Sequence, residues 1–100
     1  MIESFGNKTA QEIWERDASK AVPDSLWFRA KALLTIMHAT SNLEDLRIRG
    51  QPPSIRLHKL KGDRRHEWSV SLNRQSPLRI TFKFKSGKFL DVRIEDYHEG

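Results

Sequence analysis

The sequence predicts an α+β fold, in which two to three N-terminal helices pack on one face of a mainly antiparallel, curved sheet of four to five strands. Two observations predict it. Hydrophobic residues in the first half recur with the period of an α-helix, whereas those from residue 55 onward recur with the period of two of a half-buried strand. Strands with one apolar face, joined by short turns, favour an antiparallel sheet that helices cover on that face.

The size and composition of the chain indicate a single globular domain. We expect residues 1–100 to form one domain with a modest core, because 37% of the residues are hydrophobic and 31% are charged. The absence of cysteine excludes disulfides, thiolate zinc sites and a cysteine nucleophile. No signal-peptide pattern occurs at the N-terminus, and no run approaches the roughly 18 apolar residues of a membrane span. We therefore expect a cytoplasmic protein without a membrane partner.

The first elements are a short strand and a helix. Alternation within residues 1–5 predicts the strand. Thr9 and Glu12 fit a capping box, in which each side chain satisfies an early backbone N–H group. This box predicts a helix over about residues 10–18.

The clearest helix of the chain is expected at residues 23–38. Pro23 suits a first helical turn, and hydrophobic residues recur on one face at Leu26, Ala30, Leu33, Leu34 and Met37. A second capping box, Ser41 to Glu44, predicts a short helix that Gly50 and the prolines at 52 and 53 end.

Four strands follow, each with one apolar side. The residues expected to face the helices are Ile55 and Leu57, then Trp68, Val70 and Leu72, then Leu78, Ile80, Phe82 and Phe84, and finally Leu90, Val92 and Ile94. The opposite face would show Arg79, Thr81, Lys83, Lys85 and Arg93 to solvent. Such a basic open face is suited to a phosphate backbone.

The charge of the chain is concentrated in the same half. The net charge is +5, and residues 51–100 hold eleven basic against six acidic residues while residues 1–50 are balanced. A concentrated positive field favours an anionic partner, with nucleic acid as the first candidate. The alternative is a solvated, lysine-rich sheet face.

Two segments, 57–68 and 95–100, concentrate ionisable side chains. Together His58, Asp96, Tyr97 and His98 could serve RNA cleavage, which needs a base to deprotonate the 2′-hydroxyl and an acid to protonate the leaving 5′-oxygen. The cations of the two segments would stabilise the pentacoordinate phosphorane. This route needs no metal and no cofactor.

Metal binding is the competing interpretation of His58, His66, His98 and Asp96. Zinc ligands usually occur at pair spacings that are absent from this chain, and no cysteine is present. Serine–histidine–aspartate chemistry is disfavoured as well, since no serine lies in a glycine-flanked elbow.

Three segments, "LHKLKGDRRHEWSVSL", "LRITFKF" and "VRIEDYHEG", resemble in order and spacing the HigB-type toxins (plasmid-maintenance killer proteins) of the RelE superfamily. The opening "MIESF" is also similar to the usual start of that family. The resemblance covers nearly the whole chain and is most specific over residues 57–98. The chain departs from the pattern at Lys59, where proline is frequent, at Leu78, which replaces a tryptophan, and in the longer connection at 73–78.

The resemblance implies the toxin of a type II toxin–antitoxin system, a ribosome-dependent mRNA interferase that cuts mRNA in the A site of the 70S ribosome. It also implies a HigA-type helix-turn-helix antitoxin, through whose complex operator DNA would be bound. Carried over by motif, the catalytic candidates are His58, Asp96 and His98, and the substrate-binding candidates are Lys61, Arg79 and Tyr97. Lys83, on the basic open face of the sheet, is a further substrate-binding candidate. Which residue acts as acid and which as base stays open.

A second hypothesis is a catalytically weak or inactive relative that binds RNA, the ribosome or an antitoxin as a regulatory module. Both hypotheses predict the basic face. DNA binding by this chain alone is disfavoured, because the main helix carries only Arg29 and Lys31 as basic residues.

Overall fold

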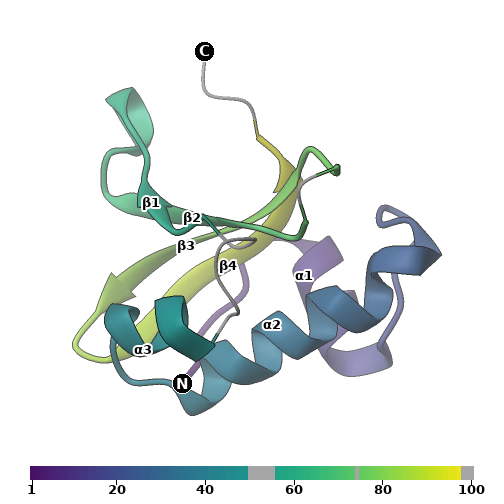
Figure 1. The fold of residues 1–100 in the computed structure, drawn as a ribbon, viewed down its shortest axis with the longest axis horizontal. Helices are drawn as coiled ribbons and strands as arrows, with labels where there is room; N and C mark the ends of the chain where they lie inside the picture. The colour runs from purple at the N-terminus through teal and green to yellow at the C-terminus, as the bar shows by residue number, and fades with distance from the viewer. Residues whose placement is uncertain (50–55, 74, 98–100) are drawn as a thin grey trace.

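The computed structural model describes residues 1–49, 56–73 and 75–97 (Figure 1). Its elements in chain order are α1 (Lys8–Arg16), the 3₁₀ turn η1 (Asp24–Leu26), α2 (Trp27–Ala39), α3 (Leu43–Arg49), β1 (His58–Lys59), the 3₁₀ turn η2 (Gly62–Arg64), β2 (Glu67–Ser71), β3 (Leu78–Lys85) and β4 (Lys88–Asp96).

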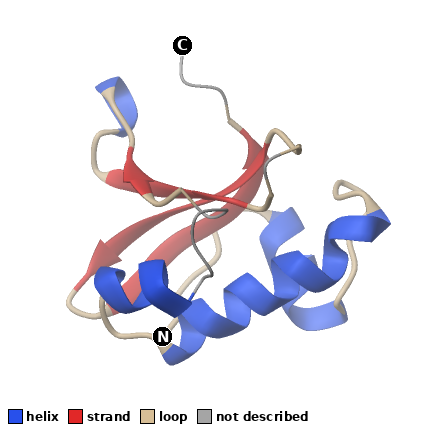
Figure 2. Ribbon diagram, in the orientation of Figure 1, coloured by secondary structure: helices blue, strands red, loops and turns tan. Residues whose placement is uncertain are grey.

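The four strands form one antiparallel sheet in the order β1-β2-β3-β4. The helices lie on one side of this sheet, and the η2 turn rises from the other side (Figures 1 and 2). The predicted α+β architecture, with three helices packed on an antiparallel sheet, is confirmed.

The N-terminal segment lies along β4, where the sequence predicts a first strand. It forms isolated parallel bridges, Ile2 to Phe89 and Phe5 to Val92, rather than a regular strand. Four backbone hydrogen bonds of 2.8–3.0 Å join the two segments. The start of the chain therefore extends the sheet beyond β4.

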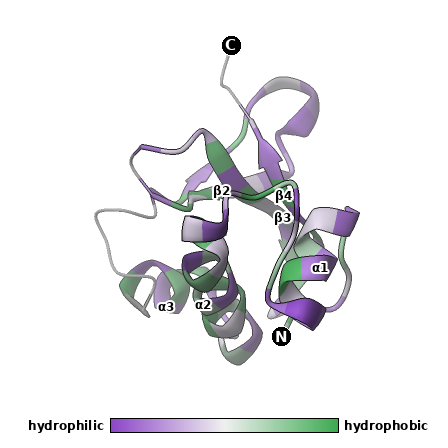
Figure 3. Ribbon diagram, turned by 90° about the vertical axis from the view of Figure 1, so that its right-hand side faces the viewer, coloured by the Kyte–Doolittle hydropathy of each residue, from purple (hydrophilic) through white to green (hydrophobic). Residues whose placement is uncertain are grey.

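The core lies between the sheet and the predicted face of α2. All five residues expected on that face, from Leu26 to Met37, are buried. Figure 3 shows hydrophobic stretches on α1 and α2, and buried residues of both helices and of β2, β3 and β4 form one core cluster. Across residues 1–49, 56–73 and 75–97, no helix is long and apolar enough to cross a membrane.

Both helix starts differ from the predicted capping boxes. Asn7, not Thr9, caps α1, and its side chain accepts a hydrogen bond from the backbone N–H of Ala10 at 3.1 Å. Asn42, not Ser41, accepts from the N–H of Asp45 at 2.7 Å at the start of α3. Asparagine serves this role as well as serine or threonine, because its amide oxygen reaches the same N–H groups. The expected helix stop at Gly50 and the prolines lies outside the described residues.

A bulge changes the inward face of β4. Thr81 pairs with Arg93 and Lys83 pairs with Leu90, so three steps along β4 oppose two along β3. Asp91 absorbs the extra residue in the left-handed region, at φ 51°. Phe89 is therefore fully buried in the core, and the prediction that Leu90 faces inward is wrong.

The second face of the sheet is less open than the sequence suggests. Thr81, expected in solvent, is 0% exposed, and Glu67, Ser69 and Ser71 on β2 are also buried. Arg64 from the η2 turn covers this face, because it bonds side chains of all three longer strands. Only the far end, at Lys83 and Lys85, is exposed as predicted.

Candidate functional site

A small pocket lies on the polar side of the sheet, where β4 ends. Three predicted site residues line it: His58 of β1, Arg79 of β3 and Tyr97 after β4. Arg56 and Ser71 complete the lining. The pocket has a volume of about 80 Å³, which is room for a few water molecules or a phosphate-sized group rather than a nucleotide.

The strand register explains why these residues meet. Ser71 pairs with Arg79, and Arg79 pairs with Glu95, so the three lie in one row across the sheet. His58 pairs with Ser69 in the next row of the same face. Ser69 and Ser71 are two residues apart on β2 and so share a face of the sheet. Their partners His58 and Arg79 therefore lie on that same face.

The backbone before β1 orients the imidazole of His58. The Nδ1 atom of His58 lies 2.9 Å from the carbonyl oxygen of Arg56. Arg56 adopts a left-handed conformation with φ 47°, which non-glycine residues rarely adopt. This contact at Nδ1 holds the imidazole of His58 in its orientation beside the pocket.

Arg79 is held by its own hairpin. Its Nη1 atom donates to the carbonyl oxygens of Ser76 at 2.9 Å and Leu78 at 3.2 Å. These two bonds of Arg79 use Nη1, and a guanidinium has further N–H donors on Nε and Nη2 that suit an anion. Arg79 and Arg56 together give this pocket two cationic side chains.

The other predicted residues lie elsewhere. Lys61 is exposed directly before η2. Lys83 is four residues from Arg79 along β3, roughly 13 Å at 3.3 Å per residue, and its Nζ pairs with Asp91 at 3.1 Å. Asp96 is exposed opposite Leu78, so alternation turns it away from the face that holds Glu95. His98 lies outside the described residues.

Beside the pocket, Arg64 forms the centre of an ion-pair network. Its guanidinium donates to both carboxylate oxygens of Glu67, at 3.0 and 2.7 Å, and to both of Glu95, at 3.2 and 2.6 Å. Thr81 also donates a short hydrogen bond to Glu95. The hydrogen bonds to Glu67 and Glu95 raise the pKa of Arg64. Burial would raise the pKa of Glu95, but the bonds from Arg64 and Thr81 outweigh it and lower this pKa.

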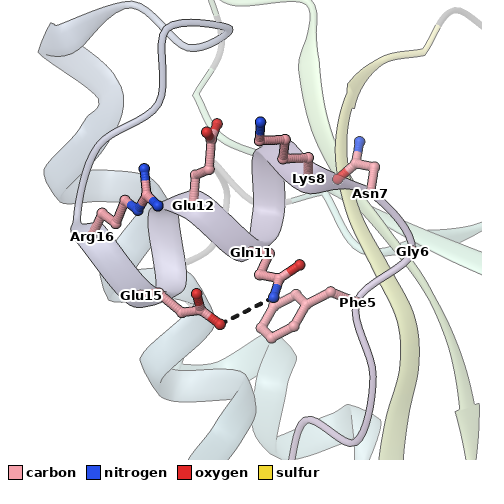
Figure 4. A pocket seen from close by; sticks show the side chains of 8 residues that line it. All are labelled: Phe5, Gly6, Asn7, Lys8, Gln11, Glu12, Glu15 and Arg16. Carbon is pink, nitrogen blue, oxygen red and sulfur yellow. Dashed lines mark hydrogen bonds between the residues drawn. The ribbon is translucent and has the colours of Figure 1, made fainter.

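A larger hollow lies on the other layer of the molecule, along α1 (Figure 4). Its volume is about 530 Å³ and its charged lining residues are Lys8, Glu12, Glu15 and Arg16. Glu15 accepts a hydrogen bond from Gln11 at 3.1 Å within the same helix. No predicted site residue lines this hollow, and its four charges cancel, so it offers no field for an anionic substrate.

Metal-ligating side chains do not gather in the part of the chain that the structure describes. There, no three histidine, aspartate or glutamate residues lie close enough to hold a metal ion together. The chemistry that the pocket offers is an imidazole, two guanidinium groups, a hydroxyl and a phenol. These groups can bind an anion and transfer protons.

Sequence reasoning did not select Arg56 or Ser71. A signal for Ser71 was present, because it alternates with Val70 and so belongs to the same face as Arg79. Arg56 gave no such signal, since its position depends on the left-handed turn before β1.

Comparison with known proteins places these observations in a family. Residues 3–98 match the HigB-like toxin family, described as the RelE-like toxin of the type II toxin-antitoxin system HigB. The chain is also 31% identical, over 98 residues, to a protein of Proteus vulgaris named Endoribonuclease HigB. That alignment covers 98% of this chain and 100% of the relative.

Proposed function

This chain belongs to the HigB family of RelE-like toxins of type II toxin–antitoxin systems, and we propose that it is an endoribonuclease that cuts mRNA in the ribosomal A site and so stops translation. The observation that carries the proposal is the pocket in which His58, Arg79 and Tyr97 meet. Those three residues come from separate strands or strand ends, and each supplies a different part of phosphodiester cleavage.

The proposed reaction is metal-independent. A base takes the proton of the 2′-hydroxyl, the 2′-oxygen bonds to the adjacent phosphorus, and the bond from phosphorus to the 5′-oxygen breaks. An acid then protonates the leaving 5′-oxygen, which yields a 2′,3′-cyclic phosphate and a 5′-hydroxyl end. The cations stabilise the charge that gathers on the phosphorane oxygens.

We assign the groups of the pocket to these tasks. His58 transfers a proton, and the contact of its Nδ1 atom with the carbonyl of Arg56 orients the imidazole for this role. Arg79 and Arg56 bind the scissile phosphate, since guanidinium groups pair with phosphate oxygens two at a time. Tyr97 stacks on a base or bonds the RNA.

The remaining candidates belong to the edges of the site. Lys61 would bind phosphate from the loop before η2, and Lys83 would contact the RNA further along the sheet. Asp96, the last residue of β4, and His98, two residues further along the chain, are the further candidates for proton transfer or for orienting the substrate. Single substitutions of the two histidines would show which of them acts as the acid and which as the base.

Partners follow from the family. We propose that a HigA-type helix-turn-helix antitoxin neutralises the chain in the cytoplasm, and that operator DNA is bound through that complex. The basic excess of the second half suits the RNA of the ribosome, because it provides a field that attracts phosphates at long range.

A reconstituted translation reaction tests the proposal. The purified chain is added to a defined mRNA, with and without ribosomes that display a chosen codon in the A site, and RNA 5′ ends are mapped. We expect codon-aligned cuts that occur only when ribosomes are present. The cuts should persist when, after ribosome assembly, a chelator lowers free divalent ions to the minimum that the ribosomes tolerate. A His58→Ala variant should not produce them.

The competing regulatory module makes a different prediction. If the wild-type chain bound ribosomes but cut no mRNA, and if growth arrest on induction survived His58→Ala, the enzyme proposal would be wrong. A co-expressed antitoxin from a neighbouring gene should relieve arrest under either hypothesis, so relief alone does not decide between them.

A further inference from the structure

Arg64 differs from the other cations of the loop between β1 and β2. Its side chain is 24% exposed, whereas the neighbouring Arg65 lies in solvent. It also reaches across the sheet, because its guanidinium bonds Glu67 on β2, Thr81 on β3 and Glu95 on β4. One side chain therefore links the η2 turn to three strands.

The hydrogen-bonding capacity of Arg64 is almost fully used by the protein. A guanidinium has five N–H donors in one plane, and the structure directs Nε, Nη1 and Nη2 to the four oxygens of Glu67 and Glu95. Such paired, bidentate contacts are the strongest that arginine makes. A phosphate would have to displace a carboxylate to use these donors.

The charge of Arg64 is also balanced. Glu67 accepts from Arg64 and lies 3.8 Å from Arg93, while Glu95 accepts from Arg64. Two arginines and two glutamates thus form a neutral group on the polar face of the sheet. Arg64 contributes to the basic composition of the loop but not to the field that an RNA would meet.

The face of the guanidinium is occupied by Tyr97. The central carbon of Arg64 lies 4.9 Å from the centre of the Tyr97 ring, a cation–π contact. Glu95 is two residues before Tyr97, so Arg64 holds both the chain that leads to this tyrosine and the ring itself. The same ring lines the pocket with His58 and Arg79.

We propose that Arg64 is a positioning residue of the cleavage site, which holds the Tyr97 ring at the His58–Arg79 pocket and does not itself bind RNA phosphate. The inference rests on the proposed function for its catalytic consequence. The contact between Arg64 and Tyr97, by contrast, can be measured without RNA.

The first experiment observes the ring directly. Tyr97 is the single tyrosine of the chain, so ¹³C-labelled tyrosine gives one set of ring signals in the NMR spectrum. Arg64→Lys keeps the charge but loses the flat fork, and it should shift and broaden these signals. Arg65→Lys is the matched control and should leave them in place. Unchanged signals in a folded Arg64→Lys protein would overturn the proposal.

The second experiment uses ribosome-dependent cleavage. Arg64→Lys should lower kcat roughly ten- to hundredfold, the scale of a misplaced group, with a smaller change in KM. In a Tyr97→Ala background Arg64→Lys should lower kcat little further, because the ring that Arg64 positions is absent. Full, additive losses in the double variant would show that Arg64 acts on RNA independently and would overturn the proposal.

Salt dependence separates positioning from phosphate binding. Removal of a phosphate ligand lowers the slope of log K against log salt by about 0.7 for single-stranded RNA. Arg64→Lys should leave this slope unchanged, and so should Arg64→Met combined with Glu67→Gln, which removes the cation together with one of the carboxylates that it pairs. A slope that falls in this charge-balanced double variant would contradict the proposal.

Two controls keep the outcomes distinct. Thermal unfolding reports whether Arg64→Lys folds, and if it does not, Glu95→Gln keeps the arginine, weakens one anchor and should shift the same Tyr97 signals. If the wild-type chain cuts no mRNA on ribosomes, the proposed function fails, while the ring signals still decide whether Arg64 holds Tyr97.

Discussion

His58 has the surroundings of a proton-transfer group rather than of a surface histidine. It is half-buried, its Nδ1 atom contacts a backbone carbonyl, and it shares a pocket with two arginines. An imidazole that is held in one orientation beside cationic side chains is a candidate for general acid–base catalysis.

His58→Ala should therefore lower the cleavage rate roughly 10²- to 10⁴-fold, the range that a positioned acid or base supplies. The matched control is His66→Ala, since His66 is exposed on the turn before β2. Single-turnover cleavage on programmed ribosomes measures both variants. Equal losses in the two would remove His58 from the mechanism.

The two predicted cations on β3 should differ in importance. Arg79 lines the pocket, whereas Lys83 pairs with Asp91 and lies beyond the ion-pair network. Arg79→Ala should reduce affinity for single-stranded RNA and flatten its salt dependence by about 0.7 per phosphate contact, and Lys83→Ala should do so less. Equilibrium binding at several salt concentrations tests the ranking, which a larger effect at Lys83 would reverse.

At the level of residues, the sequence could predict that the segments of His58, Arg79 and Tyr97 lie near one another, and the structure places these three side chains around one pocket. It could not predict the partners of Arg64. Glu95 is 31 residues away along the chain, and which row of the sheet receives the η2 turn depends on the fold. A count of basic residues includes Arg64 like any other cation, whereas the fold pairs it with two glutamates.

Among the elements, α1 depends on the side-chain amide of Asn7, which both caps the helix and connects it to β4. Asn7 caps the helix and also bonds the backbone of Ile94 on β4, accepting at 3.3 Å and donating at 2.9 Å. Loss of an N-cap alone costs about 1 kcal/mol, and the bonds to β4 add to this.

Asn7→Ala should lower the free energy of unfolding by about 2 kcal/mol, the sum of a cap and a further hydrogen bond. Thr9→Ala, at the cap position that the sequence favours, should stay within about 0.5 kcal/mol. Urea denaturation measures both. A larger loss at Thr9 would restore the predicted capping box.

The bulge in β4 makes a second element-level prediction. Phe89 is fully buried and contacts Phe82 and Phe84 edge to face, with ring centres 5.1 and 5.0 Å apart. Phe89→Ala should cost about 3–5 kcal/mol, as buried aromatic truncations do, and Leu90→Ala, half-exposed, should cost much less. The same denaturation experiment decides, and the opposite order would place Leu90 in the core.

Helix and strand positions were predictable because the hydrophobic period of a long segment indicates both the type of element and its buried face. Caps and bulges were not, because each depends on a single residue with competitors nearby. Asn7 and Thr9 are both among the preferred cap residues, and Asn7 has in addition a hydrogen bond to Ile94 that depends on the fold. Strict alternation cannot reveal a bulge, because the extra residue at Asp91 reverses the parity of everything before it in β4.

For the whole molecule, the polar face of the sheet combines two functions in adjacent rows. One part is a neutral, bonded frame around Arg64, and the other is a cationic pocket around Arg79. The frame is built from groups whose charges depend on pH, so the stability of the fold and the geometry of the pocket should change together in acid.

Acid should weaken this frame through Glu95. Its pKa in the folded protein lies below the ordinary value of 4.5, because the bonds from Arg64 and Thr81 outweigh burial. A lowered pKa means that the contribution of Glu95 to stability is complete above about pH 4.5 and is lost as the pH falls through the pKa of the folded protein.

Glu95→Gln should thus destabilise the protein clearly at pH 7 and progressively less toward pH 3, because wild type loses the same contribution. Glu44→Gln, which removes an exposed carboxylate 3.7 Å from Arg47, should change little at either pH. Urea denaturation across this range provides the measurement, and a Glu95→Gln curve parallel to that of wild type would show that the frame does not depend on the Glu95 charge.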